Sequence, residues 1–442
     1  MDFKLIKLDD AFCHQLFSSS QPNKLPNSIS EGSYDIFSQA IELNIIEKCD
    51  VEALSNPHPN NKYPVFKKVL PLLAHEQAHW VDYTSTLFGF QFLYKVYYCF
   101  YKITNENTKE FYKKNLLFNE INKIKFPEYY STKFDVDSSR PWKYTCTAGQ
   151  LFNKEGELSE YPIFFTSFLN KHDELIARQP FSLCSLFEAS STNQEILAEI
   201  DLINSFLSDD EKSVEIPLNQ EKFLKRLYSP DLTEYSIAAH KLANSIGTTD
   251  SIEAYKISAT LAHLCFNFPS HAFRKFSLEK IYEPDDPTLS KMKIALEHND
   301  RAALFYFLTD LLRIKTKPLE ATSNNIEELI TKLFDEHGIT ISEMENSVEQ
   351  ELKLITDEAV ASFKEDAYIQ ELFSSGVDRF KKLGIFGTGK YPFKDITAPG
   401  AVLGDGYFFD PYNRTDTNIE ERYSKFSKFL THLESFSNAC IF

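Results

Sequence analysis

A chain of 442 residues with 43% hydrophobic and 14% aromatic residues can bury one large core or two ordinary ones, which excludes an intrinsically disordered protein. The formal charge of −17 and the lack of a sustained Lys/Arg block argue against nucleic acid as the main partner. Only 13 glycines are present, and neither GxxxxGK[ST] nor GxGxxG occurs, which argues against a glycine-rich nucleotide site.

Three features of the sequence bear on its compartment. The N-terminal stretch MDFKLIKLDDAFCHQLF mixes charges with apolar residues, so it lacks the uninterrupted apolar core of a secretory signal. The longest apolar run, residues 87–101, is short, rich in Tyr and interrupted by Lys95, so we expect no membrane span. The seven cysteines form no CxxC pair and fit reduced, mostly buried thiols. These features predict a cytoplasmic protein with no membrane partner.

In the first 130 residues, the sequence pattern predicts a loop, then strands and then helices. Residues 21–27, QPNKLPN, predict a surface loop, and the Ile- and Phe-rich residues 34–49 predict a strand or a strand pair. The turn-rich residues 56–64 follow. Pro71 suits the first turn of a helix that should run to about Gly89, where the chain kinks or restarts. The helical pattern then continues through two further stretches, 90–103 and 108–124.

The rest of the chain predicts one hairpin and many helices. Residues 142–169 alternate, are rich in β-branched and aromatic residues, and have a turn at 154–156, which predicts a β-hairpin. A second apolar helix is expected at 183–207, followed by an acidic break at 208–213. Further helices are predicted at 233–246, 251–266, 301–312 and 342–373, and an irregular tail at 384–412. The sequence therefore predicts an α+β, mostly helical protein with a small β-hairpin or sheet.

The first long helix carries the stretch LAHEQAHWVD, in which His75 and His79 are four residues apart around Glu76. Side chains at this spacing lie about 40° apart around a helix and one turn apart in height, so both imidazoles can bind one cation. This is the HExxH pattern, in which two histidines bind Zn²⁺ and the glutamate takes a proton from water that the metal acidifies. The alternative is a pair of solvated or core histidines, but burying three ionisable groups without partners costs several kcal/mol.

A catalytic zinc site needs a third protein ligand and an open fourth position. Asp82 lies about 10 Å along the helix axis from His75, so it is interpreted as a carboxylate that orients a histidine ring, or as a solvated residue. Glu188 and Glu195 are seven residues apart on one face of the second apolar helix, among small residues, and either can complete a His₂Glu set. Alternatively, both are surface carboxylates of an ordinary amphipathic helix.

The stretch HEQAHWVDYTSTLFG, followed more than a hundred residues later by EASSTNQE, resembles the zincin metallopeptidases. The resemblance is to bacterial HExxH proteins in which Thr and Gly follow the motif and a later helix opens Glu-x-x-Ala. The matching positions here are His75, Glu76, His79, Thr86, Gly89 and Glu188, with Ser191 in place of the Ala. The resemblance implies a gluzincin-like site with His75, His79 and Glu188 as zinc ligands and Glu76 as general base. It implies nothing about the C-terminal half.

We therefore expect a zincin-like catalytic region at residues 1–210 and a helical region at 211–442 that shapes a cleft or binds a regulatory protein partner. The expected activity is zinc-dependent hydrolysis of a peptide or protein substrate. The hairpin at 142–169 would offer an edge strand to an extended peptide. Two alternatives are a dedicated defence or toxin effector protease with a single target, and a non-catalytic, zinc-containing interaction protein.

Other candidate residues carry less weight. His240 and His263 lie on apolar helical faces, which predicts core histidines. Cys99 and Cys184 are expected to be packing residues. Tyr407 is a candidate hydrogen-bond donor to the transition state.

Overall fold

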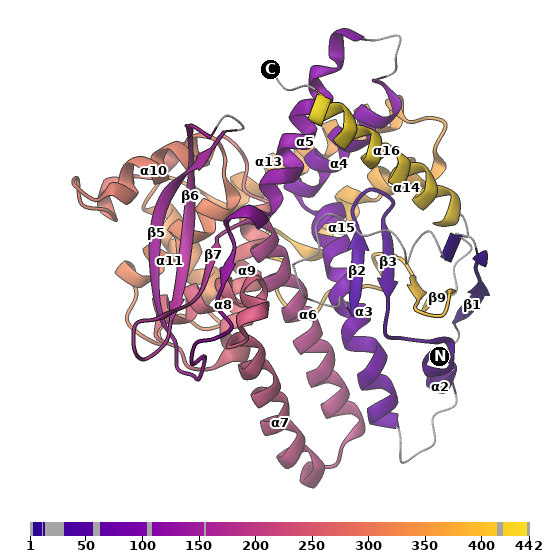
Figure 1. The fold of residues 1–442 in the computed structure, drawn as a ribbon, viewed down its shortest axis with the longest axis horizontal. Helices are drawn as coiled ribbons and strands as arrows, with labels where there is room; N and C mark the ends of the chain where they lie inside the picture. The colour runs from indigo at the N-terminus through magenta and orange to yellow at the C-terminus, as the bar shows by residue number, and fades with distance from the viewer. Residues whose placement is uncertain are drawn as a thin grey trace.

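The computed structural model describes residues 3–10, 12–13, 31–55, 62–103, 108–153, 156–412 and 419–439. Most of these residues form helices, and two small sheets complete the fold, which confirms the predicted α+β, mostly helical class (Figure 1). The predicted loop at 21–27 and most of the turn-rich stretch 56–64 lie outside the described residues. No described helix combines the length and the apolar character needed to cross a bilayer.

The first sheet joins the two ends of the chain. Its strands, in spatial order, are β1 (Lys4–Lys7), β9 (Tyr407–Asp410), β8 (Ala401–Leu403), β3 (Ala40–Leu43) and β2 (Gly32–Asp35). All neighbours are antiparallel except β3 and β8, which run parallel with Ile41 opposite Ala401. The stretch 34–49, predicted to be a strand or a strand pair, contains β3 and the last two residues of β2. The tail predicted to be irregular instead supplies β8 and β9, so the sheet contains strands from both 1–210 and 211–442.

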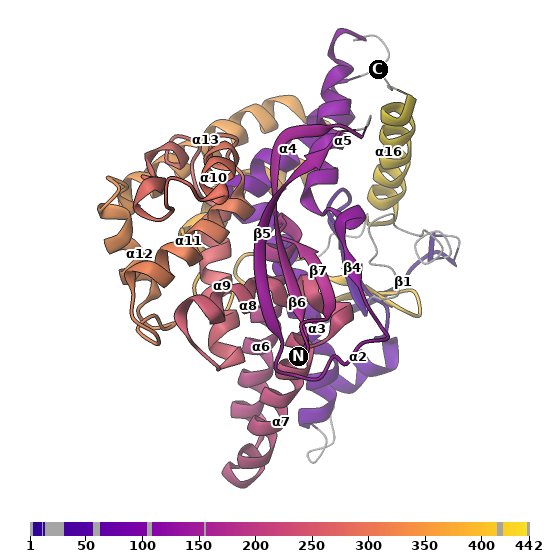
Figure 2. The same ribbon diagram turned by 60° about the vertical axis from the view of Figure 1, so that its left-hand side comes forward.

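The second sheet has the order β4 (Ser131–Thr132), β7 (Leu175–Pro180), β6 (Leu158–Leu169), β5 (Lys143–Phe152), with all neighbours antiparallel (Figure 2). Strands β5 and β6 are the predicted hairpin, and Gly156 in its turn has a φ of 80°, which favours glycine. The helix α10 (Pro287–Glu297) packs against both strands. This sheet therefore forms its own layer at one side of the helical body.

Two 24-residue helices, α3 (Lys62–Ser85) and α6 (Leu183–Phe206), pack side by side at the centre of the molecule (Figure 1). The second apolar helix predicted at 183–207 is thus confirmed, and Ser182 caps it by accepting a hydrogen bond from the Ser185 amide. The predicted start of the first helix near Pro71 is wrong, because α3 begins nine residues earlier and Pro71 lies inside it.

The predicted restart of the chain near Gly89 is confirmed. Helix α3 ends at Ser85, and Thr86 caps α4 (Leu87–Tyr101) by accepting a hydrogen bond of 3.2 Å from the Gly89 amide. A Cβ atom at Gly89 would lie 2.2 Å from the Tyr83 carbonyl oxygen. Glycine is therefore required for the two helices to approach at this junction.

The remaining helices cover the central pair. They are α2 (Lys48–Ser55), α5 (Tyr112–Ile124), α7 (Asp209–Leu227), α8 (Thr233–Ile246), α9 (Ser251–Phe266), α11 (Arg301–Lys315), α12 (Ile326–Asp335), α13 (Ile341–Ser362), α14 (Ala367–Ser374), α15 (Gly376–Leu383) and α16 (Ile419–Ala439). The predicted acidic break at 208–213 is the start of α7, where Ser208 and Glu211 form a capping box. The single helix predicted at 342–373 is two helices, because Asp366 caps α14.

Candidate metal centre

Four ionisable side chains from the two central helices meet at one place. His75, Glu76 and His79 come from α3, and Glu188 comes from α6. The Nε2 atoms of His75 and His79 lie 3.4 and 3.8 Å from Oε2 of Glu188. Among the described residues, His75, His79 and Glu188 are the one group of three or more His, Cys, Asp or Glu residues whose possible ligand atoms all lie within 4.8 Å of one another. The predicted ligand set is thus brought together by the fold.

These three side chains fit a tetrahedral cation. Ligands bound at ~2.0–2.1 Å to a tetrahedral Zn²⁺ are separated from each other by ~3.4 Å, close to the two distances observed. The Oε2 atom of Glu188 is buried and accepts no hydrogen bond within the described part of the chain. A buried carboxylate oxygen that accepts no hydrogen bond is unfavourable, and a bound cation would relieve this.

Glu195, the other candidate for the third ligand, lies on the opposite edge of the His75 ring. Its Oε2 atom is 3.4 Å from Nδ1 of His75, whereas Glu188 faces Nε2. Arg226 holds the Glu195 carboxylate through two hydrogen bonds of 2.5 and 3.0 Å, and Lys222 adds a third of 3.2 Å. Glu195 thus favours a proton on Nδ1, and a cation at the cluster would displace the proton from Nε2, which also lies 3.1 Å from Ser191 Oγ.

The electrostatics of the cluster favour a cation. Burial opposes a charge on His75, but Glu188 and Glu195 outweigh it and raise the pKa of His75 to about 10. Burial lowers the pKa of His79 to about 4, so this ring is neutral at pH 7. Burial would raise the pKa of Glu188, yet the two histidines hold it below its usual value. The two carboxylates on either side of the His75 ring thus create a negative potential at the cluster.

Glu76 lies beneath the edge strand β2. It is 5% exposed, and burial raises its pKa to about 8. A Cβ atom on Gly32 of β2 would lie 2.7 Å from Oε1 of Glu76, so the strand passes directly over this carboxylate. Neither Gly32 nor the position of β2 was identifiable from the sequence, because both depend on the pairing of β2 with β3.

Two cavities meet at the cluster. One has a volume of about 220 Å³, includes residues 32–37 and has an apolar wall with Tyr83, Phe92 and Phe187. The other has a volume of about 280 Å³. Four residues line both cavities: Gly32, His75, Glu76 and Tyr235. The cluster is therefore accessible from two sides along β2.

Tyr235 of α8 is a site residue that the sequence did not reveal. Its ring centroid is 6.1 Å from that of His75, and the charge of Glu188 raises its pKa well above the usual value. Tyr407, the predicted donor, instead lies on β9 with the ammonium groups of Lys7 and Lys48 over its ring, and it lines neither cavity. The hairpin at 142–169, which was predicted to offer an edge strand, also lines neither cavity. The edge strand beside the cluster is β2.

The remaining candidates are buried. Asp82 is fully buried and accepts a 3.1 Å hydrogen bond from Ser190, with His263 Nδ1 3.8 Å away, so its interpretation as a solvated residue is wrong. His263 and His240 are core histidines as predicted, and His240 Nε2 lies 2.8 Å from the Leu227 carbonyl oxygen. Cys99 is buried as a packing residue, whereas Cys184 lines the 220 Å³ cavity with a pKa raised by burial.

No protein-family model, curated protein or solved structure matches the chain. Its chemistry must therefore be inferred from the geometry and the residue types of the cluster.

Proposed function

We propose that this chain is a zinc-dependent metallopeptidase, with His75, His79 and Glu188 as metal ligands. The observation that supports the proposal is the cluster itself: three ligand atoms within 4.8 Å of one another, beside the buried carboxylate of Glu76. Zn²⁺ in a His₂Glu set supplies a Lewis acid that acidifies water and polarises a carbonyl group.

Glu76 is the general base in this proposal. It accepts the proton of the attacking water and then delivers that proton to the leaving amine. A group that must both take and give a proton works best with a pKa near the working pH, and burial raises the pKa of Glu76 to about 8. Because Glu76 is not a ligand, its loss should affect catalysis and leave metal binding intact.

Tyr235 is the hydrogen-bond donor to the transition state. Its hydroxyl stays protonated because the charge of Glu188 and burial both raise its pKa. A neutral hydroxyl beside the ligands can stabilise the negative charge that develops on the carbonyl oxygen of a substrate. The position of Tyr235 in both cavities supports this role.

Strand β2 is the substrate-binding edge. It is the last strand of its sheet and runs over Glu76, so a peptide added beside it would lie along both cavities. Main-chain pairing of this kind holds a peptide extended, with alternate side chains pointing into the cavities.

The test is a Glu76→Gln variant compared with wild type. We expect equal zinc content, near one ion per chain, and hydrolysis lowered by ~10²–10⁴-fold. Asp310→Asn is the matched control, since Asp310 is another buried carboxylate but bonds Lys241 and Tyr282 and lines neither cavity. New protein N-termini in a proteome incubated with each protein are read by mass spectrometry.

Three outcomes separate the proposals. Many new termini that disappear in Glu76→Gln support a broad peptidase. Termini confined to one protein support the dedicated effector. Bound zinc with identical termini in wild type and Glu76→Gln would support the non-catalytic interaction protein and contradict the proposed hydrolysis.

A further inference from the structure

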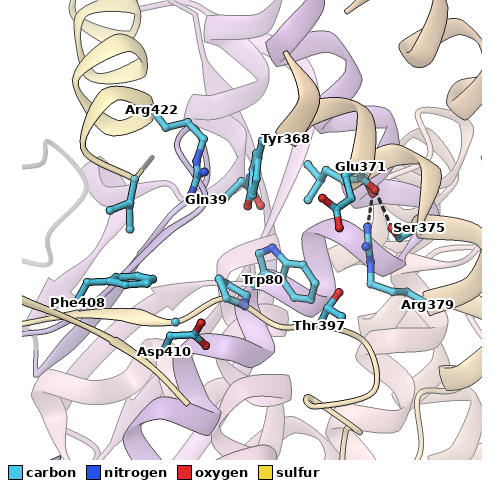
Figure 3. A pocket seen from close by; sticks show the side chains of 14 residues that line it. Gln39, Trp80, Tyr368, Glu371, Ser375, Arg379, Thr397, Phe408, Asp410 and Arg422 are labelled. Carbon is cyan, nitrogen blue, oxygen red and sulfur yellow. Dashed lines mark hydrogen bonds between the residues drawn. The ribbon is translucent and has the colours of Figure 1, made fainter. Parts of the chain in front are cut away.

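A third cavity, of about 320 Å³, shares no lining residue with the two at the metal centre (Figure 3). We call it the Trp80 cavity, because the Trp80 indole forms its floor. Trp80 follows His79 on α3, and the other walls come from α14, α15, β9, α16 and residues 397–400. Its volume is at the small end of ligand-binding cavities.

Two buried hydrogen-bond donors of this cavity are incompletely satisfied. Trp80 is 3% exposed, and its Nε1 atom has no hydrogen-bond partner in the described part of the chain. Arg379 is also 3% exposed, and its guanidinium lies 5.1 Å from the Trp80 ring. Both residues line the cavity, and Figure 3 shows the Trp80 indole between Gln39 and Arg379. An unpaired indole N–H and a buried guanidinium are each unfavourable without an acceptor.

Arg379 has a charge that the protein offsets only in part. Its Nε and Nη2 atoms donate to the carbonyl oxygens of Thr84 and Leu372, in the last turns of α3 and α14, where the helix dipoles are negative. Within the described residues, no carboxylate oxygen lies within 4 Å of this guanidinium. Two of its five N–H groups donate the hydrogen bonds just named, which leaves three for a ligand. A ligand carboxylate can bind these N–H groups in the planar geometry that guanidinium prefers.

The rim and the walls of the cavity indicate which other chemical groups a ligand needs besides a carboxylate. Glu371 is an exposed residue at the cavity, and it forms no ion pair within the described part of the chain, so it can bind a cationic group. Leu372, Phe408 and Ile419 supply apolar wall. The buried interior also contains Arg422 and the carboxylate of Asp410, so a ligand carboxylate is favoured at the Arg379 end of the cavity. The rim attracts an ammonium group, and the walls accept an apolar side chain.

We propose that the Trp80 cavity binds a free α-amino acid with an apolar side chain. The carboxylate binds Arg379 and the Trp80 N–H, and the ammonium group lies toward Glu371. This site is independent of the proposed peptidase activity, since it uses none of the residues of the metal centre.

The chain contains only two tryptophans, which makes Trp80 a usable reporter. In a Trp142→Phe background, L-leucine should change the fluorescence of Trp80 in a saturable way. L-leucinamide, which lacks the carboxylate, should give no saturable change, and N-acetyl-L-leucine, which lacks the ammonium group, should bind ~2–5-fold more weakly. Inorganic phosphate tests for a general anion site, and saturable binding of phosphate but not of leucine would overturn the proposal.

Two variants locate the binding. Glu371→Gln, at the exposed rim, should weaken leucine ~2–5-fold and leave N-acetyl-L-leucine unchanged or tighter. Arg379→Gln should weaken leucine ~10–100-fold, provided circular dichroism shows an unchanged helical content. Glu188→Ala, which disables the metal centre, should bind leucine as well as its parent does. No saturable change with leucine in the folded parent, or its loss in Glu188→Ala, would overturn the proposal.

Discussion

Replacing Glu195 by Ala tests whether a carboxylate outside the ligand set controls metal affinity through His75. The Glu195 carboxylate lies 3.4 Å from Nδ1 of His75, and two hydrogen bonds from Arg226 fix its position. Removing such a partner of a histidine ligand costs ~10–100-fold in metal affinity, or about 1.4–2.7 kcal/mol. Glu188→Ala should cost more, because it removes one of three bonds to the metal.

The same change also affects stability, and the two effects can be separated. Without Glu195, Arg226 loses its bidentate partner in a site where its side chain is only 20% exposed, which should lower the free energy of unfolding by about 3 kcal/mol. Glu199→Ala is the matched control, because Glu199 also contacts Lys222 but not His75. It should lower stability and leave zinc affinity unchanged.

The assay is competition with a chromophoric zinc chelator at fixed pH, next to urea unfolding of the metal-free proteins. Equal loss of zinc affinity in Glu195→Ala and Glu199→Ala would show that general destabilisation, and not the contact with His75, sets the affinity. A larger loss in Glu195→Ala than in Glu188→Ala would make Glu195 the ligand and refute the assignment of the two carboxylates.

Three further predictions concern catalysis, pH and packing. Tyr235→Phe should lower kcat ~10²–10³-fold with unchanged zinc content, and an unchanged kcat would remove Tyr235 from the mechanism. Burial lowers the pKa of His240 from 6.5 to about 4, so the folded chain binds fewer protons than the unfolded chain in this window. The free energy of unfolding should therefore fall by about 3 kcal/mol through this group as the pH falls from 6.5 to 4, and His240→Gln should flatten that slope in urea titrations. A variant with the slope of wild type would contradict this pKa. Gly89→Ala should lower the free energy of unfolding by ~1–3 kcal/mol or more in thermal unfolding, because its Cβ would meet Tyr83. Gly338→Ala is the control: its Cβ meets no atom within 4 Å, so it should cost only about 1 kcal/mol, for the positive φ. Equal effects of the two substitutions would argue against the contact with Tyr83.

Local patterns predicted the long apolar helices and the hairpin at 142–169, because periodicity and turn residues lie within each element. The start of α3 was misplaced because proline suits a first turn. In the structure, the residues before Pro71 bury Phe66 and Val69, and this packing outweighs the hydrogen bond that proline cannot donate. Strands β8 and β9, with three and four residues, are too short for a recognisable pattern, and β8 pairs with β3 from the other end of the chain.

The candidate site could be predicted only where its residues share a helix. His75, Glu76 and His79 were identifiable from their spacing on α3. Glu188 and Glu195 could not be separated, because they lie on one face of α6 and differ in which nitrogen of His75 they meet. That difference depends on the height of α6 relative to α3. Tyr235 and the overlying strand reach the cluster through tertiary packing, for which the sequence has no local signal.

The parallel pairing of β3 with β8 has a consequence for the order of assembly on the ribosome. All three proposed metal ligands have been synthesised when α6 is complete, whereas β8 is made about 200 residues later. Until then β3 lacks its inner neighbour, and the hairpin that it forms with β2 has no sheet to join. An isolated two-stranded hairpin is at best marginally stable. In the proposed mechanism, the metal ligands are therefore made long before the chain has a firm edge on which to hold a peptide. Zinc and peptide binding measured on a chain truncated before β8 would test the two proposed properties separately.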